Sequence, residues 1–295
     1  MVDQFDMIEA GQNSRRRWIG IAALAVVLAV PVVSVLTSRD PRPPPPPPPA
    51  PTSRAPLTTI TSAQNALYVE PVKRGGDEII QVVFPHGLRA EVRYPAALRL
   101  AELGSRPYHG IWADGEGYPE YRPLTTPYHG DYEITRGEEP LRRLTGNVTL
   151  WPRPPGAGAT GQVLLFEFGK WRLAMYDARR SLAFETRMAI AERLRATITK
   201  DGYLVLSASG PVRMARPGEG RRSAPAGPQL WFGGVGSDTL GLIPAPDCSL
   251  PDVPASVASA SPHSRAVCRG DILVAAAGSK EFVDTAVAKI RVRPK

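Results

Sequence analysis

The chain has 295 residues, of which 43% are hydrophobic and 22% are charged, and its formal net charge is +8. This length gives room for one large domain or two small ones, and the hydrophobic content is ordinary for a globular core. The positive charge is not gathered into a basic run interleaved with aromatic residues, which argues against nucleic acid as a partner.

A long apolar run lies near the N-terminus, from Trp18 to Leu36, and it contains no charged residue. At about 1.5 Å per residue it spans about 28 Å, close to the hydrocarbon thickness of a bilayer. Residues 15–17 are all arginine, so the positive-inside rule predicts a cytoplasmic tail at 1–17. We therefore predict a single-pass signal-anchor helix at 18–36, in contact with the lipid bilayer of the cell membrane.

A cleaved signal peptide is the alternative interpretation of the same run. The apolar region of a signal peptide is usually shorter and ends at a small-residue cleavage site. Here the run is longer, and the sites at its end, such as Val32–Ser34, are weak matches. Both interpretations place the C-terminal part of the chain in the extracellular space.

A proline-rich segment follows, with the sequence PRPPPPPPPAP at Pro41–Pro51. Proline fixes φ and cannot donate a backbone hydrogen bond, so this segment is predicted to form a polyproline II rod of roughly 34 Å. We assign residues 37–63 to an extended proline-rich linker that spaces a domain at 64–295 away from the membrane.

The domain begins with a predicted β-hairpin. Glu78–Pro85 is an apolar strand, and residues 88–94 alternate apolar and charged side chains. The connection Phe84–Gly87 (FPHG) fits a turn in which Gly87 takes the left-handed conformation. A short helix is expected at Leu98–Leu103, with Gly104 ending it.

The next part, residues 105–161, is predicted to be rich in loops with short strands, because it contains many Gly and Pro residues. A second hairpin is expected at 162–177 around Gly169. Residues 181–199 are predicted to form the longest helix, capped by Ser181 and stopped at Asp201-Gly202. Its expected apolar stripe consists of Phe184, Met188, Ala191, Leu194 and Ile198.

Three elements are predicted in the last third of the chain: strands at 203–209 and 271–278, and a closing helix from Ser279 to about Ile290. Hairpin strands with occasional helices indicate an α+β fold, with a mainly antiparallel sheet and two or three helices. The two cysteines of the chain, Cys248 and Cys268, are expected to form a disulfide, because the domain is predicted to lie outside the membrane.

Three of the four histidines lie in similar tetrapeptides: His86 in FPHG, and His109 and His129 in two copies of PYHG. His109 and His129, with Asp131 and Glu133 nearby, are the candidates for acid–base chemistry. Their spacing is not that of a metal-ligand pair, so we predict neither a metal nor a cofactor. The simplest interpretation is that these histidines lie in turns.

The segment around the PYHG copies also concentrates aromatic residues, which are candidates for ligand binding: Tyr108, Trp112, Tyr118, Tyr121 and Tyr128. No common hydrolase or P-loop motif is present in the sequence. We therefore expect a membrane-anchored envelope protein with an extracytoplasmic binding or interaction domain, whose partner is an envelope polymer or a protein. The alternative is a secreted-side hydrolase or metal-dependent enzyme that uses the His- and acid-rich segment 105–135.

Overall fold

The structure is a computed structural model that describes residues 65–114, 119–153, 161–177, 181–221, 224–234, 237–248 and 261–295. All of these residues belong to one compact unit, residues 60–295. The predicted tail, membrane helix and proline-rich linker therefore lie outside the described residues. Within the described ranges, no helix combines the length and hydropathy needed to cross a bilayer.

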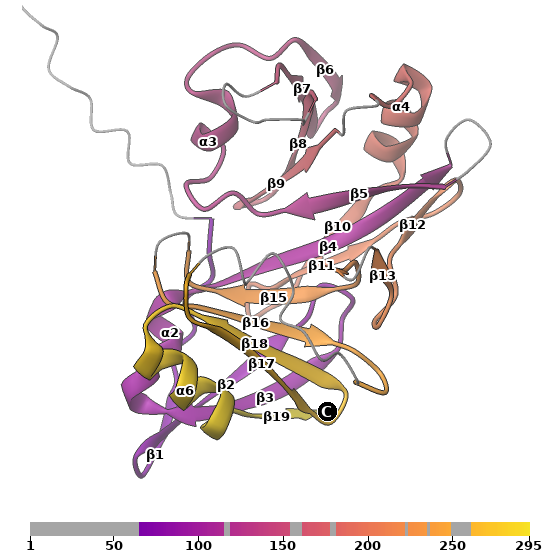
Figure 1. Cartoon of the computed structure of the whole chain (residues 1–295). Coiled ribbons are helices and arrows are strands. Elements are labelled where there is room, and N and C mark those ends of the chain that lie inside the picture. Colours follow the sequence, from indigo (N-terminus) through magenta and orange to yellow (C-terminus); the bar gives the residue numbers. More distant parts are fainter. Residues whose placement is uncertain are drawn as a thin grey trace, which may run out of the picture. The chain divides into compact units, whose positions relative to one another are not determined.

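An eleven-stranded antiparallel sheet dominates the unit (Figure 1). Ten of its strands form a continuous path, and the remaining strand, β12 (Val212–Met214), pairs with β4. The strands of the path are, in order, β17 (Ser264–Arg269), β18 (Ile272–Ala277), β16 (Thr239–Pro244), β15 (Gln229–Phe232), β4 (Ser105–Asp114), β5 (Pro119–Thr125), β9 (Trp171–Tyr176), β8 (Val163–Phe168), β7 (Val148–Trp151) and β6 (Arg142–Thr145).

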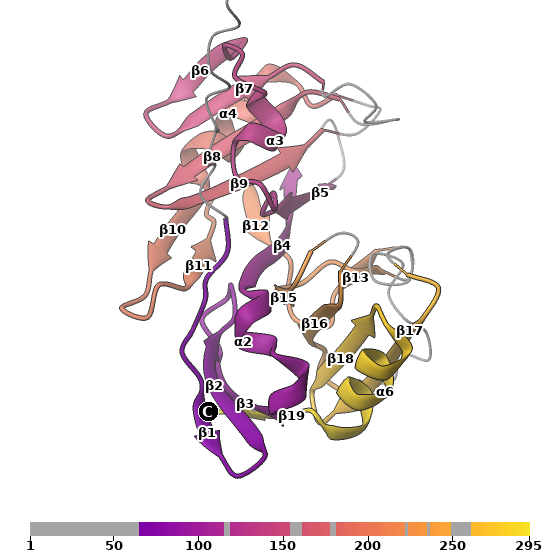
Figure 2. The same cartoon turned by 90° about the vertical axis from the view of Figure 1, so that its left-hand side faces the viewer.

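A separate four-stranded antiparallel sheet holds the predicted first hairpin and is visible in Figure 2. Its strands are, in order, β1 (Val72–Arg74), β2 (Asp77–Val83), β3 (Arg89–Pro95) and β19 (Arg291–Pro294). Two short hairpins complete the strands: β10 (Arg195–Ile198) with β11 (Leu204–Ser207), and β13 (Gly220–Arg221) with β14 (Ala224–Pro225).

Four α-helices occur in the described residues, and all are short: α2 (Leu100–Leu103), α3 (Tyr132–Thr135), α4 (Phe184–Arg193) and α6 (Lys280–Lys289). A 3₁₀ turn, η1 (Ala96–Leu98), precedes α2. The fold is thus mainly antiparallel sheet with a few helices, which agrees with the predicted α+β class in this broad sense.

One large hydrophobic cluster joins the two main sheets with α4 and α6. Figure 2 shows α6 beside β17 and β18, and its buried side chains Phe282, Val283 and Ala286 pack into that cluster. The described core therefore extends through both main sheets and both of the longer helices.

Several predicted elements are confirmed. The first hairpin is β2–β3, where Gly87 has φ +96° and its N–H donates to the carbonyl of Phe84. The second hairpin is β8–β9, with Gly169 at φ +55°. The closing helix is α6, whose N-cap Ser279 accepts a hydrogen bond from the N–H of Phe282.

The predicted helix at 181–199 is wrong in its second half. α4 ends at Arg193, and residues 195–198 form β10, which pairs with β11. The Asp201-Gly202 step, interpreted as a helix stop, is the turn of this hairpin, with Gly202 at φ +88°. Ser181 is not the cap either, because the N-cap residue is Ala183 and it makes no side-chain capping bond.

The predicted apolar stripe of this helix is confirmed only in part: Ala191 and Leu194 are buried. Phe184 and Ile198 are exposed, whereas the buried side chains of α4 include Ile190 and the charged Arg187. The loop-rich prediction for 105–161 is also wrong, because β4 runs for ten residues from Ser105. Pro107 and Gly110 inside β4 conceal the alternation that would otherwise identify a strand.

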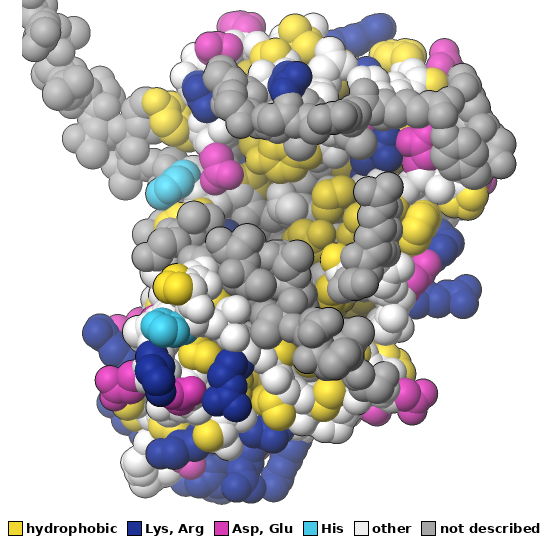
Figure 3. Space-filling view, viewed as in Figure 1, with side chains coloured by type: hydrophobic (Ala, Val, Ile, Leu, Met, Phe, Trp, Pro, Cys, Tyr) yellow, Lys and Arg dark blue, Asp and Glu magenta, His cyan; other side chains and the backbone are white. Residues whose placement is uncertain are grey.

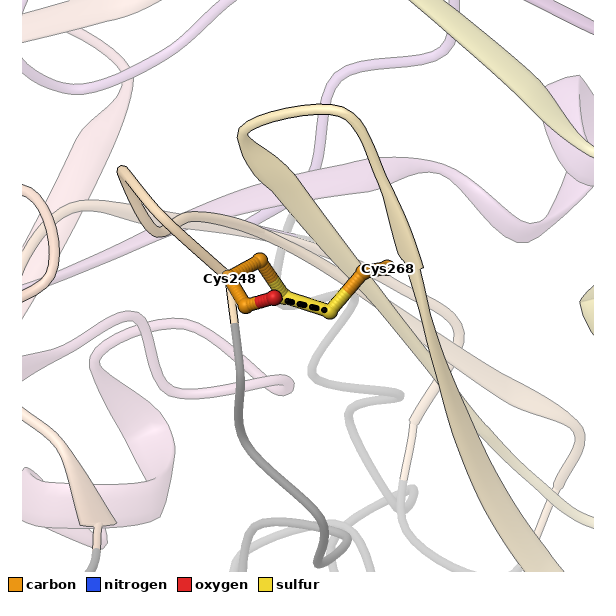
Figure 4. The surroundings of a disulfide bond; sticks show 2 residues. All are labelled: Cys248 and Cys268. Atoms are coloured by element: carbon orange, nitrogen blue, oxygen red, sulfur yellow. Dashed lines mark hydrogen bonds between the residues drawn. A yellow bond between two sulfur atoms is a disulfide. The ribbon is translucent and has the colours of Figure 1, made fainter.

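The predicted disulfide joins Cys248 to Cys268, with their Cα atoms 5.9 Å apart (Figure 4). Cys268 belongs to β17, and Cys248 lies just beyond the end of β16. Both side chains pack beside Ile243 and Leu273, which form a small apolar cluster. The disulfide therefore fastens the connection between neighbouring parts of the sheet, as is typical of a structural cross-link.

Candidate functional site

β4 has two chemically different faces. Its odd-numbered residues point into the core, and Ser105, His109 and Ile111 are all at most 1% exposed. The intervening positions Arg106, Tyr108 and Trp112 are half-buried. Because successive side chains of a strand alternate between faces, these three residues share the other face, which we call the outer face of β4.

Gly110 allows a close packing on this outer face. A Cβ atom at this position would lie under 3.0 Å from the ring of Tyr121 and from the carbonyl oxygen of Ala226, which no real side chain does. The first PYHG copy is therefore part of a strand, and its glycine makes space for an aromatic ring. In the second copy, Gly130 has φ +69° and its N–H donates to the carbonyl of Pro127, as in a turn.

Aromatic side chains from β4 and β5 contact one another on the outer face. Trp112 lies opposite Tyr121 in the pairing of the two strands, with ring centroids 5.3 Å apart in an edge-on arrangement. The hydroxyl groups of Tyr108 and Tyr121 are 3.4 Å apart. Such packing fixes the ring positions before any ligand arrives, which lowers the entropy cost of binding.

Arg213, on β12, lies over the Trp112 ring with its guanidinium carbon 5.3 Å from the ring centroid. Its Nη1 and Nη2 donate to the two carboxylate oxygens of Glu219 at 2.9 and 2.8 Å. This bidentate ion pair raises the pKa of Arg213 and lowers the pKa of Glu219. Glu219 therefore neutralises the charge of Arg213, and the planar guanidinium of Arg213 covers the Trp112 ring.

A hollow of about 180 Å³ lies at the other end of the outer face. In Figure 3 hydrophobic side chains are visible near the level at which Figure 1 places β5. Trp231 of β15 lies opposite Arg106 of β4 in the strand pairing, and both line the hollow. The remaining lining residues are Pro107, Tyr108, Thr125 and Thr126.

His109 lies on the core face and is fully buried. Its Nδ1 is 3.0 Å from the carbonyl oxygen of Gly110, so it acts as the donor there, and its buried Nε2 has no hydrogen-bond partner among the described residues. Burial, opposed by the Gly110 carbonyl and aided by the nearby His86, lowers the pKa of His109 to about 4. The ring is therefore neutral at neutral pH.

His129 lies in the turn after β5 and is exposed, so solvent reaches this ring and not that of His109. Its ring packs edge-on against Tyr128 at 5.0 Å, and its backbone N–H lies 3.5 Å from a carboxylate oxygen of Glu133. Asp131 lies 3.9 Å from the guanidinium of Arg172.

The structure thus brings Tyr108, Trp112 and Tyr121 together on one face, and it places Tyr128 over Arg106, whose guanidinium carbon is 5.0 Å from the ring centroid. Tyr118 lies outside the described residues. The sequence did not single out Arg106, Arg213 or Trp231. Arg106 stands directly before the first PYHG, and only the assignment of 105–114 to a strand places it on the same face as Tyr108 and Trp112.

A buried ion cluster lies where β5, β9 and α4 meet. Asp177 is fully buried, and its two carboxylate oxygens accept hydrogen bonds from Arg122 Nε at 3.0 Å and from Arg187 Nη2 at 2.8 Å. Glu120 accepts from Arg122 Nη2 at 2.7 Å, and the N–H of Leu182 donates to Asp177 at 3.0 Å. The two arginines and two carboxylates of the cluster pair with one another.

A larger hollow of about 470 Å³ adjoins η1, α2 and the N-terminus of α6. Its charged lining is mostly self-paired, since Arg99 contacts Glu102 and Asp238 accepts from the N–H of Ser279 at 2.7 Å. Its lining includes one aromatic side chain, Phe282, whereas the smaller hollow has Tyr108 and Trp231. We therefore regard the outer face of β4 as the candidate site.

Among the residues that the structure describes, no three His, Cys, Asp or Glu side chains are grouped so as to hold a metal ion. No family model, curated protein or solved structure matches the chain. The function must therefore be argued from the site itself.

Proposed function

We propose that the chain is a single-pass membrane-anchored envelope protein that presents an extracytoplasmic binding domain, and that the outer face of β4 is its binding surface. The uncharged run at 18–36 and the arginines at 15–17 support the anchor. The disulfide between Cys248 and Cys268 supports an oxidising compartment for the domain.

The grouping of Tyr108, Trp112 and Tyr121 on one sheet face, with Arg213 over the Trp112 ring, carries the proposal. Trp, Tyr and Arg are the residues most enriched among those that dominate binding free energy. A side chain held by its neighbours and still half-exposed loses little conformational freedom when a ligand packs against it.

The outer face favours an extended ligand. From Arg106 to Trp112 the strand advances six residues, or about 20 Å at the usual rise of a β-strand. Aromatic rings occur at both ends of this stretch, since Trp231 lies opposite Arg106 and Tyr121 opposite Trp112. The backbone of Ala226 packs over Gly110 in the middle of this stretch, so a long ligand would contact the two ends of the row. We therefore propose a polymer of the cell envelope, whose repeat units reach both ends, as the ligand.

Cosedimentation of the detergent-solubilised full-length protein with purified insoluble envelope polymer tests the proposal. We expect the wild-type protein to sediment with the polymer. Trp112→Ala and Tyr121→Ala should each weaken binding by more than about tenfold, the usual loss when a dominant contact residue is truncated. Circular dichroism verifies that each variant is folded.

Tyr132→Ala is the matched control, because Tyr132 is 42% exposed on α3 and contributes no ring to the outer face of β4. This variant should bind as the wild-type protein does. Equal binding by all three variants, or an equal loss in Tyr132→Ala, would show that the outer face is not the binding surface.

A further inference from the structure

We propose that the hollow lined by Arg106, Tyr108 and Trp231 holds a carboxylate of the ligand, so that the polymer bound by this protein is an acidic polysaccharide. The inference rests on the proposed binding function and specifies its ligand. It depends on the guanidinium of Arg106, which differs from the other arginines around β4 in how its charge is balanced.

Arg106 is held in place by neutral groups. Its Nη1 donates to the carbonyl of Thr126 at 3.2 Å, its Nη2 donates to the carbonyl of Gly233, and the Tyr128 ring lies against its other side. Over the described ranges, no carboxylate oxygen lies within ion-pair distance of Arg106, and Glu133 acts on it only from farther away. The guanidinium is therefore positioned without a neutralising anion.

Two neighbouring arginines, unlike Arg106, each have a carboxylate partner. Arg213 makes a bidentate pair with Glu219, and Arg122 contacts both Glu120 and Asp177. Placing a positive charge in a partly desolvated position without a partner costs free energy, and an incoming anion recovers it. Burial correspondingly lowers the pKa of Arg106.

The residues that line the hollow suit a ligand in which a sugar ring carries the carboxylate. Trp231 Nε1 donates to Gln229 Oε1 at 3.0 Å, which fixes the indole orientation. The hydroxyl groups of Thr125 and Thr126 already donate to the carbonyls of Ala174 and Pro107. The apolar C–H face of a sugar ring can pack on an aromatic wall, and a planar guanidinium binds a carboxylate through two parallel hydrogen bonds.

The experiment compares an oligogalacturonate with its methyl ester, in which each carboxylate has lost its charge and gained a methyl group. Binding of each to the full-length protein in nonionic detergent is measured by calorimetry. We expect the wild-type protein to bind the acid at least about tenfold more tightly than the ester, the usual contribution of a charge-assisted hydrogen bond.

Arg106→Gln should abolish this preference, and Arg106→Lys, which retains the charge, should reduce it less. Arg265→Gln is the control and should keep the preference, because Arg265 lies on β17, is exposed, and pairs with Asp284. The inference is overturned if the wild-type protein binds acid and ester equally or binds neither. It is also overturned if Arg106→Gln keeps the preference, or if Arg265→Gln loses as much.

The two proposals fail in different ways. If Trp112→Ala loses polymer binding but the wild-type protein shows no preference for the acid, the outer face of β4 is still supported as the binding surface and the carboxylate site is rejected. If the Trp112→Ala and Tyr121→Ala variants bind the polymer as the wild-type protein does, the outer face of β4 is rejected as the binding surface. The wild-type preference for acid over ester can be measured even if Arg106→Gln does not fold.

Discussion

His109 and His129 show that the same tetrapeptide, PYHG, places its histidine differently in a strand and in a turn. The His109 ring lies in the core with Ile111, while the next residue, Gly110, accommodates the Tyr121 ring on the outer face. In the second PYHG copy the histidine is exposed and the glycine turns the chain. One tetrapeptide thus serves as a strand segment and as a turn.

The buried ring of His109 predicts a pH-dependent stability. Its pKa is lowered from 6.5 to about 4 in the folded protein, so the unfolded chain binds more protons between these values and stability falls as the pH falls from 6.5 to 4. The loss amounts to about 3 kcal/mol and is complete below pH 4. Urea unfolding at pH 7 and pH 4 measures it.

His109→Gln removes the titrating group and should reduce the difference in unfolding free energy between the two pH values by that amount. His86 also has a lowered pKa because of burial, so the His109→Gln variant should retain the smaller contribution of His86. An identical pH dependence in wild type and His109→Gln would contradict the buried, neutral state of the ring.

At the scale of elements, the outer face of β4 is extended by the three strands that pair with β4, namely β5, β12 and β15. Each neighbour supplies a side chain to the outer face: Tyr121, Arg213 and Trp231 respectively. The buried cluster around Asp177 fastens β5 and β9 to α4, and so fixes the strand that carries Tyr121.

Asp177→Ala is therefore expected to destabilise the domain strongly. It removes the carboxylate that contacts Arg122 and Arg187, and breaking such a buried pair usually costs about 3–5 kcal/mol. Thermal or urea unfolding gives the value. The control is Asp284→Ala, which breaks exposed pairs with Arg265 and Lys280 and should leave the unfolding midpoint nearly unchanged. Similar midpoints for both variants would contradict a structural role for the cluster.

The hairpins, α6 and the disulfide were predictable because local signals and tertiary structure agree there. In β2–β3, alternating side chains flank a glycine that the turn requires, and in α6 the Ser279 cap precedes an amphipathic run. The apolar residues of 194–198 fit a helix and a strand equally well. Only their pairing with β11 decides between the two.

The binding face was only partly predictable. The sequence draws attention to Tyr108, Trp112, Tyr121 and Tyr128 by their density, but Pro107 and Gly110 hide the strand that orders them. Arg106, Arg213 and Trp231 come from three strands that meet only through sheet pairing. Such long-range pairing leaves no local pattern, so the arrangement of charge and rings had to come from the structure.

At the scale of the whole molecule, we propose a membrane anchor joined to an extracytoplasmic binding domain. The anchor predicts that externally added protease digests the 60–295 domain in intact cells, because the positive-inside rule places that domain outside. Immunodetection of a C-terminal tag measures the digestion. A cytoplasmic protein serves as the control and should stay intact, whereas protection of the tagged domain would overturn the proposed topology.

The binding face itself is tested most directly by NMR of the indole N–H groups, since its rings and the core rings give separate signals. Soluble fragments of the envelope polymer are added to the protein. Signals of Trp112 and Trp231 should shift, while those of Trp151 and Trp171, which are 6% and 1% exposed, should stay in place. Unchanged signals of Trp112 and Trp231 under conditions where the fragments bind would contradict the proposed site.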